Sequence, residues 1–521
     1  MNWKRPLALS TAALTLGTAL AACGNPTAAA PDPTPTPAAE VQSLSTTGST
    51  VKAPKYVFLF IGDGMSYPQI QSTSDFLGAL NDADYRQAQP SLDDNGGAIL
   101  DGPEYLNFMN FEAAGSAVTY DSNSFAPDSA STATSISTGY KTYSGSINVD
   151  ETGTISYETI AEQLHAQKGY SVGVITSVNL NHATPAAFYA HQASRNDYYD
   201  IGLELIDSGF EYFAGGGLLK PTGAEGDQAD LYALAEKAGY HVVKTQAEAE
   251  QVTGGPVVII DEHLADSDAM AYEIDRTDDM WALADYVAKG IEVLDNDTGF
   301  FMMCEGGKID WACHANDAAS TIHDTQALAD AVQVAIDFAK EHADETLILV
   351  TGDHETGGLT IGFAGTDYDT YLDLLESQKI SYAKFDSDYV SRYKEDKTSF
   401  EDVLKDVEAL FGLKPQGEEG DKLVLTDYEL EQLRAAYEKS VNGTAASQYE
   451  QEEYVLYGTY EPLSVTLTHI INNKSGISFT SYSHTGLPVA VLAHGVNAGQ
   501  FNGYYDNTQI YHKLAGMLGI A

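Results

Sequence analysis

The chain has 521 residues, with 27 Lys and Arg against 75 Asp and Glu, so its formal net charge is -48. This excess of acid argues against nucleic-acid binding, because a phosphate backbone is bound by clustered cations. Hydrophobic residues make up 43% of the chain, which excludes a wholly disordered or fibrous protein. Three cysteines are too few for a disulfide scaffold.

Residues 1–22 have the composition of an export signal peptide. Two cations precede an apolar run, residues 7–20, which is too short to span a bilayer. The small residues before Cys23 resemble the lipoprotein box of bacteria, in which the cysteine is lipidated and becomes the mature N-terminus. We therefore expect an exported protein, periplasmic or at the cell surface, anchored to a membrane through Cys23. The alternative is an ordinary signal peptide that contains a cysteine.

Residues 23–50 predict a linker between that cysteine and the rest of the chain. Five prolines stand among Ala and Thr in this segment, a composition that favours an extended polyproline spacer without a core. From residue 51 to residue 521 the sequence shows no further Pro-rich break and no repeat. We therefore expect one large domain after the linker.

Five short apolar runs predict buried strands. They are residues 56–61, 170–176, 299–304, 346–350 and 489–493. Helical patterns precede the second and third runs, at residues 157–167 and 279–294. Strands that alternate with helices predict an α/β fold with three layers, α/β/α, around a large and mostly parallel central sheet.

Between residues 360 and 478 the sequence becomes Tyr-rich and charged, with helix signals of its own. Thr426 and Glu429 form a capping box, Gly443 is a stop signal, and Ser399 opens another helix. A structureless loop of this length is improbable, so the segment predicts a folded, crown-like insertion. It would either contact a second subunit or shade the substrate, or form a plain surface subdomain.

Polar side chains follow four of the predicted strands, and ligands of open α/β sheets gather at the carboxyl ends of strands. The segments are Gly62-Asp63-Gly64, Asn181-His182-Ala183-Thr184, residues 305–314 and Gly352-Asp353-His354. Carboxylates, imidazoles and a hydroxyl are therefore expected at one edge of the sheet.

Two local patterns suggest chemistry without proving it. Ser129 opens a run of small residues, 128–134, and a serine at the start of a helix lies where the dipole stabilises an oxyanion. Asp310 and His314 are four residues apart and share a helical face, a natural half-site for zinc. Taken alone, the first pattern is also typical of caps and loops, and the second of a surface i,i+4 pair.

Six stretches in this order resemble the alkaline phosphatase family, and together they extend from residue 55 to about residue 510. They are Gly62-Asp63-Gly64-Met65, residues 128–134, residues 182–187 with Ser194-Arg195, residues 305–314, Asp353-His354 and His484-Thr485-Gly486. The resemblance implies a catalytic domain, residues 51–521, that hydrolyses phosphate monoesters to an alcohol and inorganic phosphate. It also implies a covalent phosphoserine intermediate, two zinc ions and a third metal, and a homodimer.

The resemblance also implies the roles of single residues. Ser129 is the expected nucleophile and Arg195 the guanidinium that grips two phosphate oxygens, so both bind substrate. The expected ligands are Asp310, His314 and His484 for the first zinc, Asp63, Asp353 and His354 for the second, and Asp63, Thr184 and Glu305 for the third metal.

His182 and Trp311 depart from the pattern of the best-studied bacterial members, which have Asp and Lys at these positions. Both residues are expected near the third metal, outside its direct ligands. We expect magnesium there, with zinc or cobalt as alternatives if His182 is itself a ligand. The absence of the lysine would also remove one water-mediated phosphate contact.

Several alternatives stay open from the sequence. A phosphodiesterase or phosphonate hydrolase is the runner-up within the superfamily, but Arg195 favours monoesters. No sulfatase modification site and no Gly-x-Ser-x-Gly of a serine esterase is found. A surface lipoprotein that binds metal or phosphate without turnover is a hypothesis of another class. Cys304 and Cys313 either pair after export or, as we favour, stay buried and reduced.

Overall fold

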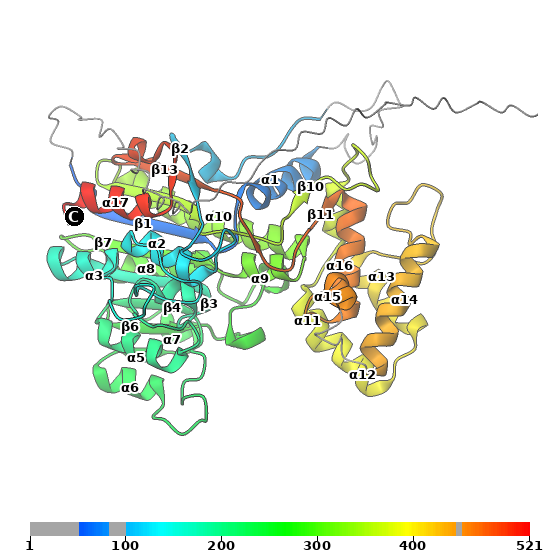
Figure 1. Cartoon of the computed structure of the whole chain (residues 1–521), viewed down its shortest axis with the longest axis horizontal. Coiled ribbons are helices and arrows are strands. Elements are labelled where there is room, and N and C mark those ends of the chain that lie inside the picture. Colours follow the sequence, from blue (N-terminus) through cyan, green and yellow to red (C-terminus); the bar gives the residue numbers. More distant parts are fainter. Residues whose placement is uncertain (1–51, 83–99, 444–450, 521) are drawn as a thin grey trace, which may run out of the picture. The chain divides into compact units, whose positions relative to one another are not determined.

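A ten-stranded sheet lies at the centre of the computed structural model, which describes residues 52–82, 100–443 and 451–520 (Figure 1). The predicted signal peptide, Cys23 and the predicted linker lie outside the described residues. The strand order across the sheet is β14 (Gly503–Asp506), β2 (Ala113–Val118), β13 (Val489–Gly495), β8 (Thr346–Gly352), β1 (Tyr56–Gly62), β7 (Phe300–Gly306), β3 (Ser171–Asn179), β4 (Tyr212–Gly216), β6 (Val257–Ile260) and β5 (His241–Val243).

The sheet is mostly parallel, which confirms the predicted fold class. β1 pairs in parallel with β7 and β8, and β3 with β7 and β4. The last predicted run, residues 489–493, was expected with the parallel strands, but β13 runs antiparallel to β8 and β2. The reason is local, because the short strand β12 (His484–Thr485) precedes β13 by only a few residues and lies at the carboxyl edge. The chain must therefore run back across the sheet from that edge.

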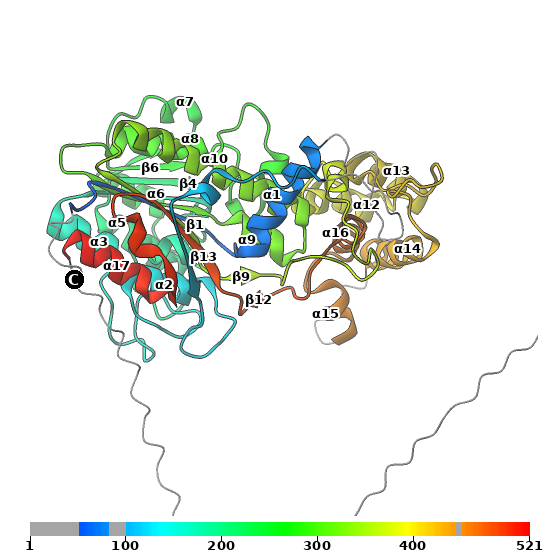
Figure 2. The same ribbon diagram turned by 90° about the horizontal axis from the view of Figure 1, so that it is seen from above.

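Helices cover both faces of the sheet, as Figure 2 shows. On β1, Val57 and Leu59 pack with α2 (Ser129–Thr138), α3 (Ile160–Gln163) and α17 (Thr508–Leu518). The alternate residues, Phe58 and Phe60, pack with α8 (Leu283–Leu294) and α10 (Ala318–Glu341) on the other face. Successive side chains of a strand point to opposite faces, so one wholly apolar strand supplies two cores.

Two predicted helices begin later than their sequence pattern suggested. α3 starts at Ile160, after Thr159 accepts the backbone N–H of Glu162, and continues as the π-helical turn η2 (Leu164–Lys168). α8 starts at Leu283 and not at residue 279, because the Asp285 carboxylate accepts the backbone N–H of Ala282 at 2.8 Å. In both cases a cap decides the first turn.

The Tyr-rich segment is a helical subdomain that begins and ends at a small antiparallel ribbon of β10 (Thr360–Ile361) and β11 (Ile477–Ser478). Its helices are α11 (Tyr382–Phe385), α12 (Ser391–Asp396), α13 (Phe400–Phe411), α14 (Asp427–Asn442), α15 (Gln451–Tyr457) and α16 (Pro462–Ser475). Ser399 and Thr426 cap α13 and α14, and Gly443 ends α14 at a φ of 78°. The subdomain has its own apolar core, which continues onto Phe76 of α1 (Tyr67–Asn81) and Ile322 of α10.

Cys304 and Cys313 are free, buried thiols, as favoured from the sequence. Within the described ranges, no helix combines the length and the apolar character needed to cross a bilayer.

Candidate active site

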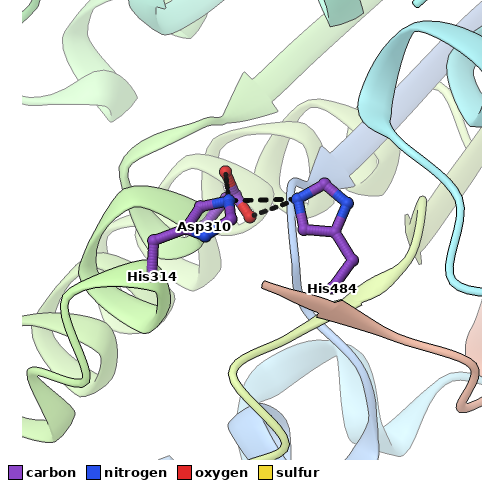
Figure 3. Close-up of side chains that lie close together, drawn as sticks. All are labelled: Asp310, His314 and His484. Carbon is purple, nitrogen blue, oxygen red and sulfur yellow. Dashed lines mark hydrogen bonds and ion pairs between the residues drawn. The ribbon is translucent and has the colours of Figure 1, made fainter. Parts of the chain in front are cut away.

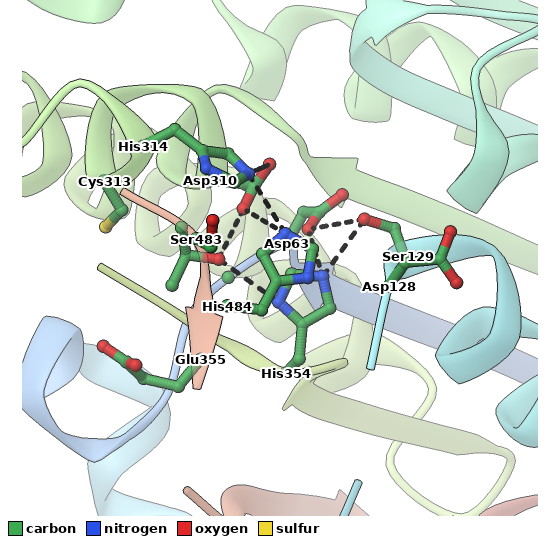
Figure 4. A network of polar contacts seen from close by, with 12 residues as sticks. Asp63, Asp128, Ser129, Asp310, Cys313, His314, His354, Glu355, Ser483 and His484 are labelled. Carbon is green, nitrogen blue, oxygen red and sulfur yellow. Dashed lines mark hydrogen bonds and ion pairs between the residues drawn. The ribbon is translucent and has the colours of Figure 1, made fainter. Parts of the chain in front are cut away.

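Ser129 is the first residue of α2 and is almost fully buried, with 1% of its surface exposed. Asp128 caps the helix by accepting the backbone N–H of Ser131 at 3.1 Å. The Ser129 hydroxyl lies 3.1 Å from His354 Nε2 and donates to Asp63 Oδ1 at 3.3 Å (Figure 4). A hydroxyl at the positive end of a helix, beside an imidazole and a carboxylate, is placed for nucleophilic chemistry.

The sheet register explains why distant carboxylates meet here. β1 lies between β7 and β8, with Ile61 opposite Glu305 and Gly62 opposite Gly352. Asp63 and Asp353 follow directly after this last pair, so three neighbouring strands end at one level. Gly64 makes the turn after β1 at a φ of 70°, and a Cβ there would lie 3.0 Å from Asp310 Oδ1.

One candidate metal group consists of Asp63, Asp310 and His354, whose ligand atoms all lie within 4.8 Å of one another. His354 Nε2 is 3.2 Å from Asp63 Oδ1 and 3.3 Å from Asp353 Oδ2. Asp353 is held in place by Gly64 N at 3.1 Å and by the Thr132 hydroxyl at 3.0 Å.

A second candidate group consists of Asp310, His314 and His484 (Figure 3). Asp310 and His314 share one face of α9 (Lys308–His314), and His484 lies in β12, which pairs with β9 (Glu355–Thr356). His314 Nε2 is 3.4 Å from Asp310 Oδ2, and His484 Nε2 is 3.5 Å from Asp310 Oδ1.

Backbone carbonyls orient both imidazoles of this second group. His314 Nδ1 lies 2.6 Å from the carbonyl of Tyr482, and His484 Nδ1 lies 2.6 Å from the carbonyl of Pro127. Each Nδ1 must therefore donate, which leaves the two Nε2 lone pairs facing each other at 3.0 Å. Metal-binding histidines are oriented in this way, so the pair fits a cation between them.

The electrostatics of the site also fit bound cations. Burial and the neighbouring Asp63 raise the pKa of Asp353 to about 7. Burial would lower the pKa of His354, but Asp353 and Asp63 outweigh it and raise that pKa to about 10. Burial would raise the pKa of Asp310, yet His314 and His484 hold it well below its ordinary value. Among the described residues, the ion-pair partners of Asp63, Asp310 and Asp353 are all histidines, an arrangement that divalent cations would relieve.

The sequence model of the alkaline phosphatase family matches residues 54–520, nearly the whole of the part that the structure describes. The chain belongs to the alkaline phosphatase family. Alkaline phosphatase 3 of Bacillus subtilis (strain 168) is 30% identical over 465 residues, which are 88% of this chain and 87% of that protein. Alkaline phosphatase 4 of the same organism is 29% identical over 461 residues, 87% of this chain and 86% of that protein.

Solved structures of alkaline phosphatases share the fold. The cold-active enzyme of a psychrophilic Shewanella species is 28% identical, with a TM-score of 0.70 over 89% of this chain and 99% of that one. The enzyme of Thermus thermophilus is 24% identical, with a TM-score of 0.69 over 90% of this chain and 92% of that one. Members of the alkaline phosphatase family are metal-dependent phosphomonoesterases, so this chain is a hydrolase of phosphate monoesters, as predicted.

The residues predicted from the alkaline phosphatase resemblance for the third metal lie on the other side of Asp63. The Thr184 hydroxyl donates to Asp63 Oδ2 at 3.2 Å. Thr176 donates to Glu305 Oε2, while Oε1 of the fully buried Glu305 has no hydrogen-bond partner among the described residues. Burial, and then Asp63, raises the pKa of Glu305 well above its ordinary value. An orphaned carboxylate oxygen beside a second carboxylate is what a cation site requires.

Arg195 reaches the start of α2 through an ion pair with Asp128, 2.8 Å from Nη1 to Oδ2. The backbone N–H of Gly145 also donates to Asp128, at 2.9 Å. Burial would raise the pKa of Asp128, but Arg195 holds it below its ordinary value. Sequence reasoning placed Asp128 in the serine motif and gave it no role. The sequence gives little sign of a role for Asp128, because its partner Arg195 lies in another motif.

His182 and Trp311, the two departures from the alkaline phosphatase pattern, lie together beside Arg195. Their rings meet edge to face with centroids 5.9 Å apart, and His182 Nε2 is 3.5 Å from Arg195 Nη2. Burial, and then the Arg195 charge, lowers the pKa of His182 to about 4. The imidazole is therefore neutral above that pH.

Thr356 is a site residue that sequence reasoning missed. Its hydroxyl donates to Asp310 Oδ1 at 2.5 Å and lies 3.2 Å from His354 Nδ1. Thr356 stands two residues after His354, and alternate residues of an extended segment share a side. That spacing was the available signal.

Proposed function

We propose that Ser129 is the nucleophile of this phosphomonoesterase and carries the phosphoryl group as a phosphoserine. The observation that supports this best is the Ser129 hydroxyl, 3.1 Å from His354 Nε2 and 3.3 Å from Asp63 Oδ1 at the start of α2. In the first step Oγ loses its proton and forms a bond to phosphorus while the ester P–O bond breaks, and the leaving oxygen takes up a proton and departs as the alcohol. In the second step water attacks the same phosphorus, which releases phosphate and restores the hydroxyl.

We assign two zinc ions to this site by the chemistry of its donors. Mixed carboxylate and imidazole donors suit zinc, and three protein ligands leave a position open. Asp310, His314 and His484 would hold the first ion, and Asp63, Asp353 and His354 the second. Bound dications supply charge stabilisation for the attacking and leaving oxygens and lower the pKa of a bound hydroxyl or water.

We assign magnesium to the third site. Its donors are Asp63, Thr184 and Glu305, and magnesium prefers oxygen ligands with several waters retained. His182 Nε2 lies 3.5 Å from Arg195 Nη2, so this nitrogen faces the guanidinium, and we place the imidazole beside the third metal, outside its direct ligands. Zinc or cobalt is the alternative, since an imidazole ligand would favour either. Metal analysis of the purified protein, with and without His182→Ala, decides between them.

Arg195 is the proposed phosphate clamp, because a guanidinium donates two parallel hydrogen bonds to phosphate oxygens. The Asp128 carboxylate accepts a hydrogen bond from Arg195 Nη1 at 2.8 Å. Because Asp128 directly precedes Ser129, this contact holds the guanidinium close to the proposed nucleophile. A monoester carries oxygens that this cation can bind, which favours monoesters over diesters. Trp311 packs edge to face against His182, the neighbour of Arg195.

The decisive experiment compares p-nitrophenyl phosphate hydrolysis by the wild type and by Ser129→Ala, both analysed for metals. We expect the wild type to turn over and the variant to be inactive with its metals retained. Comparable, negligible rates in both proteins would favour a lipoprotein that binds phosphate or metal without turnover. Activity of Ser129→Ala close to that of the wild type would refute the phosphoserine.

We further propose that the protein is exported, lipidated at Cys23 and homodimeric. The support is the sequence before Cys23 and the family resemblance. Mass spectrometry of the mature N-terminus, and fractionation of the wild type against Cys23→Ala, test the anchor. Light scattering of the purified protein tests the dimer.

A further inference from the structure

Lys308 is a buried cation at the start of α9, two residues before the candidate metal ligand Asp310. Its side chain is 0% exposed, and Nζ lies 2.6 Å from Oδ1 of Asp266, whose own side chain is 32% exposed. A buried ion pair is weak evidence of stabilisation, since an apolar pair of similar size is often as stable. The position therefore calls for another explanation.

Two aromatic rings enclose the Lys308 ammonium. Nζ lies 4.2 Å from the ring centroid of Tyr272 and 4.6 Å from that of Trp311. Both distances are within the range of cation–π attraction, which is strengthened when the cation is desolvated. Lys308, held by Asp266, therefore packs against the face of the Trp311 indole and supports that ring.

A continuous set of contacts runs from this ion pair to the phosphate clamp. The Trp311 ring meets the His182 ring edge to face at 5.9 Å, and His182 Nε2 lies 3.5 Å from Arg195 Nη2. Asp128 holds the other side of the guanidinium at 2.8 Å. Among the described residues, Nη1 of Arg195 is thus held by a carboxylate, and Nη2 faces the His182 imidazole, which meets the Trp311 ring edge to face.

We propose that Lys308, paired with Asp266, is a positioning residue for the phosphate clamp and acts through Trp311 and His182 on Arg195. The inference rests on the proposed function, in which Arg195 binds the phosphate. Lys308 does not touch the substrate. Without the charge of Lys308, the Trp311 indole loses its support and the His182 ring that contacts it shifts. The Arg195 guanidinium is then no longer held at the angle that two hydrogen bonds to phosphate need.

The test measures binding of inorganic phosphate by calorimetry to full-length, metal-loaded protein in a Ser129→Ala background, which excludes turnover. Lys308→Met keeps the length of the side chain and removes the charge. We expect the phosphate dissociation constant to rise about tenfold with metal content unchanged, as for loss of other supporting contacts. Lys308→Arg should restore most of the affinity. Lys289→Met is the matched control, because Lys289 is also buried and paired, with Glu292 at 2.5 Å, in α8.

Phosphate affinity of Lys308→Met equal to that of Lys289→Met would overturn the inference. If Lys308→Met does not fold, Asp266→Asn is measured in its place. We expect this variant to lose less affinity for phosphate than Lys308→Met would, and an affinity equal to that of the wild type would contradict the inference. Arg195→Ala in the same background separates this failure from failure of the proposed function. Unchanged phosphate binding by Arg195→Ala would refute the clamp itself. Weaker phosphate binding by Arg195→Ala together with unchanged binding by Lys308→Met would refute only the positioning role of Lys308.

Discussion

The Thr356 hydroxyl lies 2.5 Å from Asp310 Oδ1, although the two residues belong to β9 and α9. The same hydroxyl is 3.2 Å from His354 Nδ1. Asp310 belongs to the proposed first zinc site and His354 to the proposed second. One small side chain therefore orients a ligand of each ion, and such partners matter to metal affinity nearly as much as the ligands do.

Thr356→Val, which keeps the shape and removes the hydroxyl, is expected to weaken zinc binding about 10- to 100-fold. Competition with a chromophoric chelator measures this affinity directly. Thr346→Val serves as the control, because Thr346 is equally buried on β8 and its hydroxyl donates only to the His342 carbonyl. Equal zinc affinity in the two variants would contradict the bridging role.

Arg195→Ala is expected to raise KM and the inhibition constant of phosphate about 10- to 100-fold, since hydrogen bonds to a charged group contribute about 1.5–3 kcal/mol. Arg195→Lys should recover only part of this, because an ammonium lacks the planar fork. The exposed Arg392, paired with Asp406 at 2.8 Å, provides a control substitution to Ala. Tight phosphate binding by the zinc-loaded Arg195→Ala protein would disprove the clamp.

His191 predicts a pH-dependent contribution to stability away from the active site. Burial would lower its pKa, but Glu162 at 3.4 Å and Glu204 at 3.2 Å raise it to about 10. A histidine whose pKa is raised in the folded state stabilises that state fully below the pKa of the unfolded state, about 6.5. This stabilisation is lost as the pH rises through the pKa of the folded state.

His191→Gln should therefore lower the free energy of unfolding most near pH 6, on the order of 3 kcal/mol, and hardly at all above about pH 10. Thermal unfolding of both proteins at pH 6, 8 and 10 measures the difference. His512→Gln is a suitable control, since no ion pair of that residue is found within the described residues. A difference that stayed constant over this range would count against the paired imidazolium.

Removal of metals is expected to destabilise the protein and to abolish hydrolysis. The bound ions stabilise only the folded state, so a chelator lowers the melting temperature and added zinc and magnesium restore it. In the metal-free protein, Asp353 has its pKa raised to about 7 by burial and Asp63. A raised carboxyl pKa means that stability falls as pH rises from about 4 to about 7. Calorimetry with and without chelator at pH 5 and 8 should show the larger loss at pH 8.

Much of the fold follows from local sequence patterns. The run at residues 56–61 is apolar at every position, as a strand buried on both faces must be, and it forms β1. The spacing of Asp310 and His314 places both on one face of α9, and Thr426 with Glu429 caps α14. These signals are readable because the contacts that they describe lie within one helical turn or one strand.

The arrangement of the site depended on contacts that no local pattern encodes. That β1 lies between β7 and β8 decides that Asp63 meets Glu305 and Asp353, and strand order is set by packing across the whole sheet. β13 is antiparallel because the chain enters the sheet from the edge that carries His484. Motif resemblance could group these residues, yet it did not predict what surrounds them.

The sequence by itself determined which side chains were available and which strand or helix would carry them, because periodicity and caps act over a few residues. The tertiary structure alone decided how those side chains are oriented. The carbonyls of Pro127 and Tyr482 turn two imidazoles toward each other, and the Lys308 ammonium braces Trp311. Such orientation comes from hydrogen bonds and packing between segments far apart in the chain, which exist only once the chain has folded.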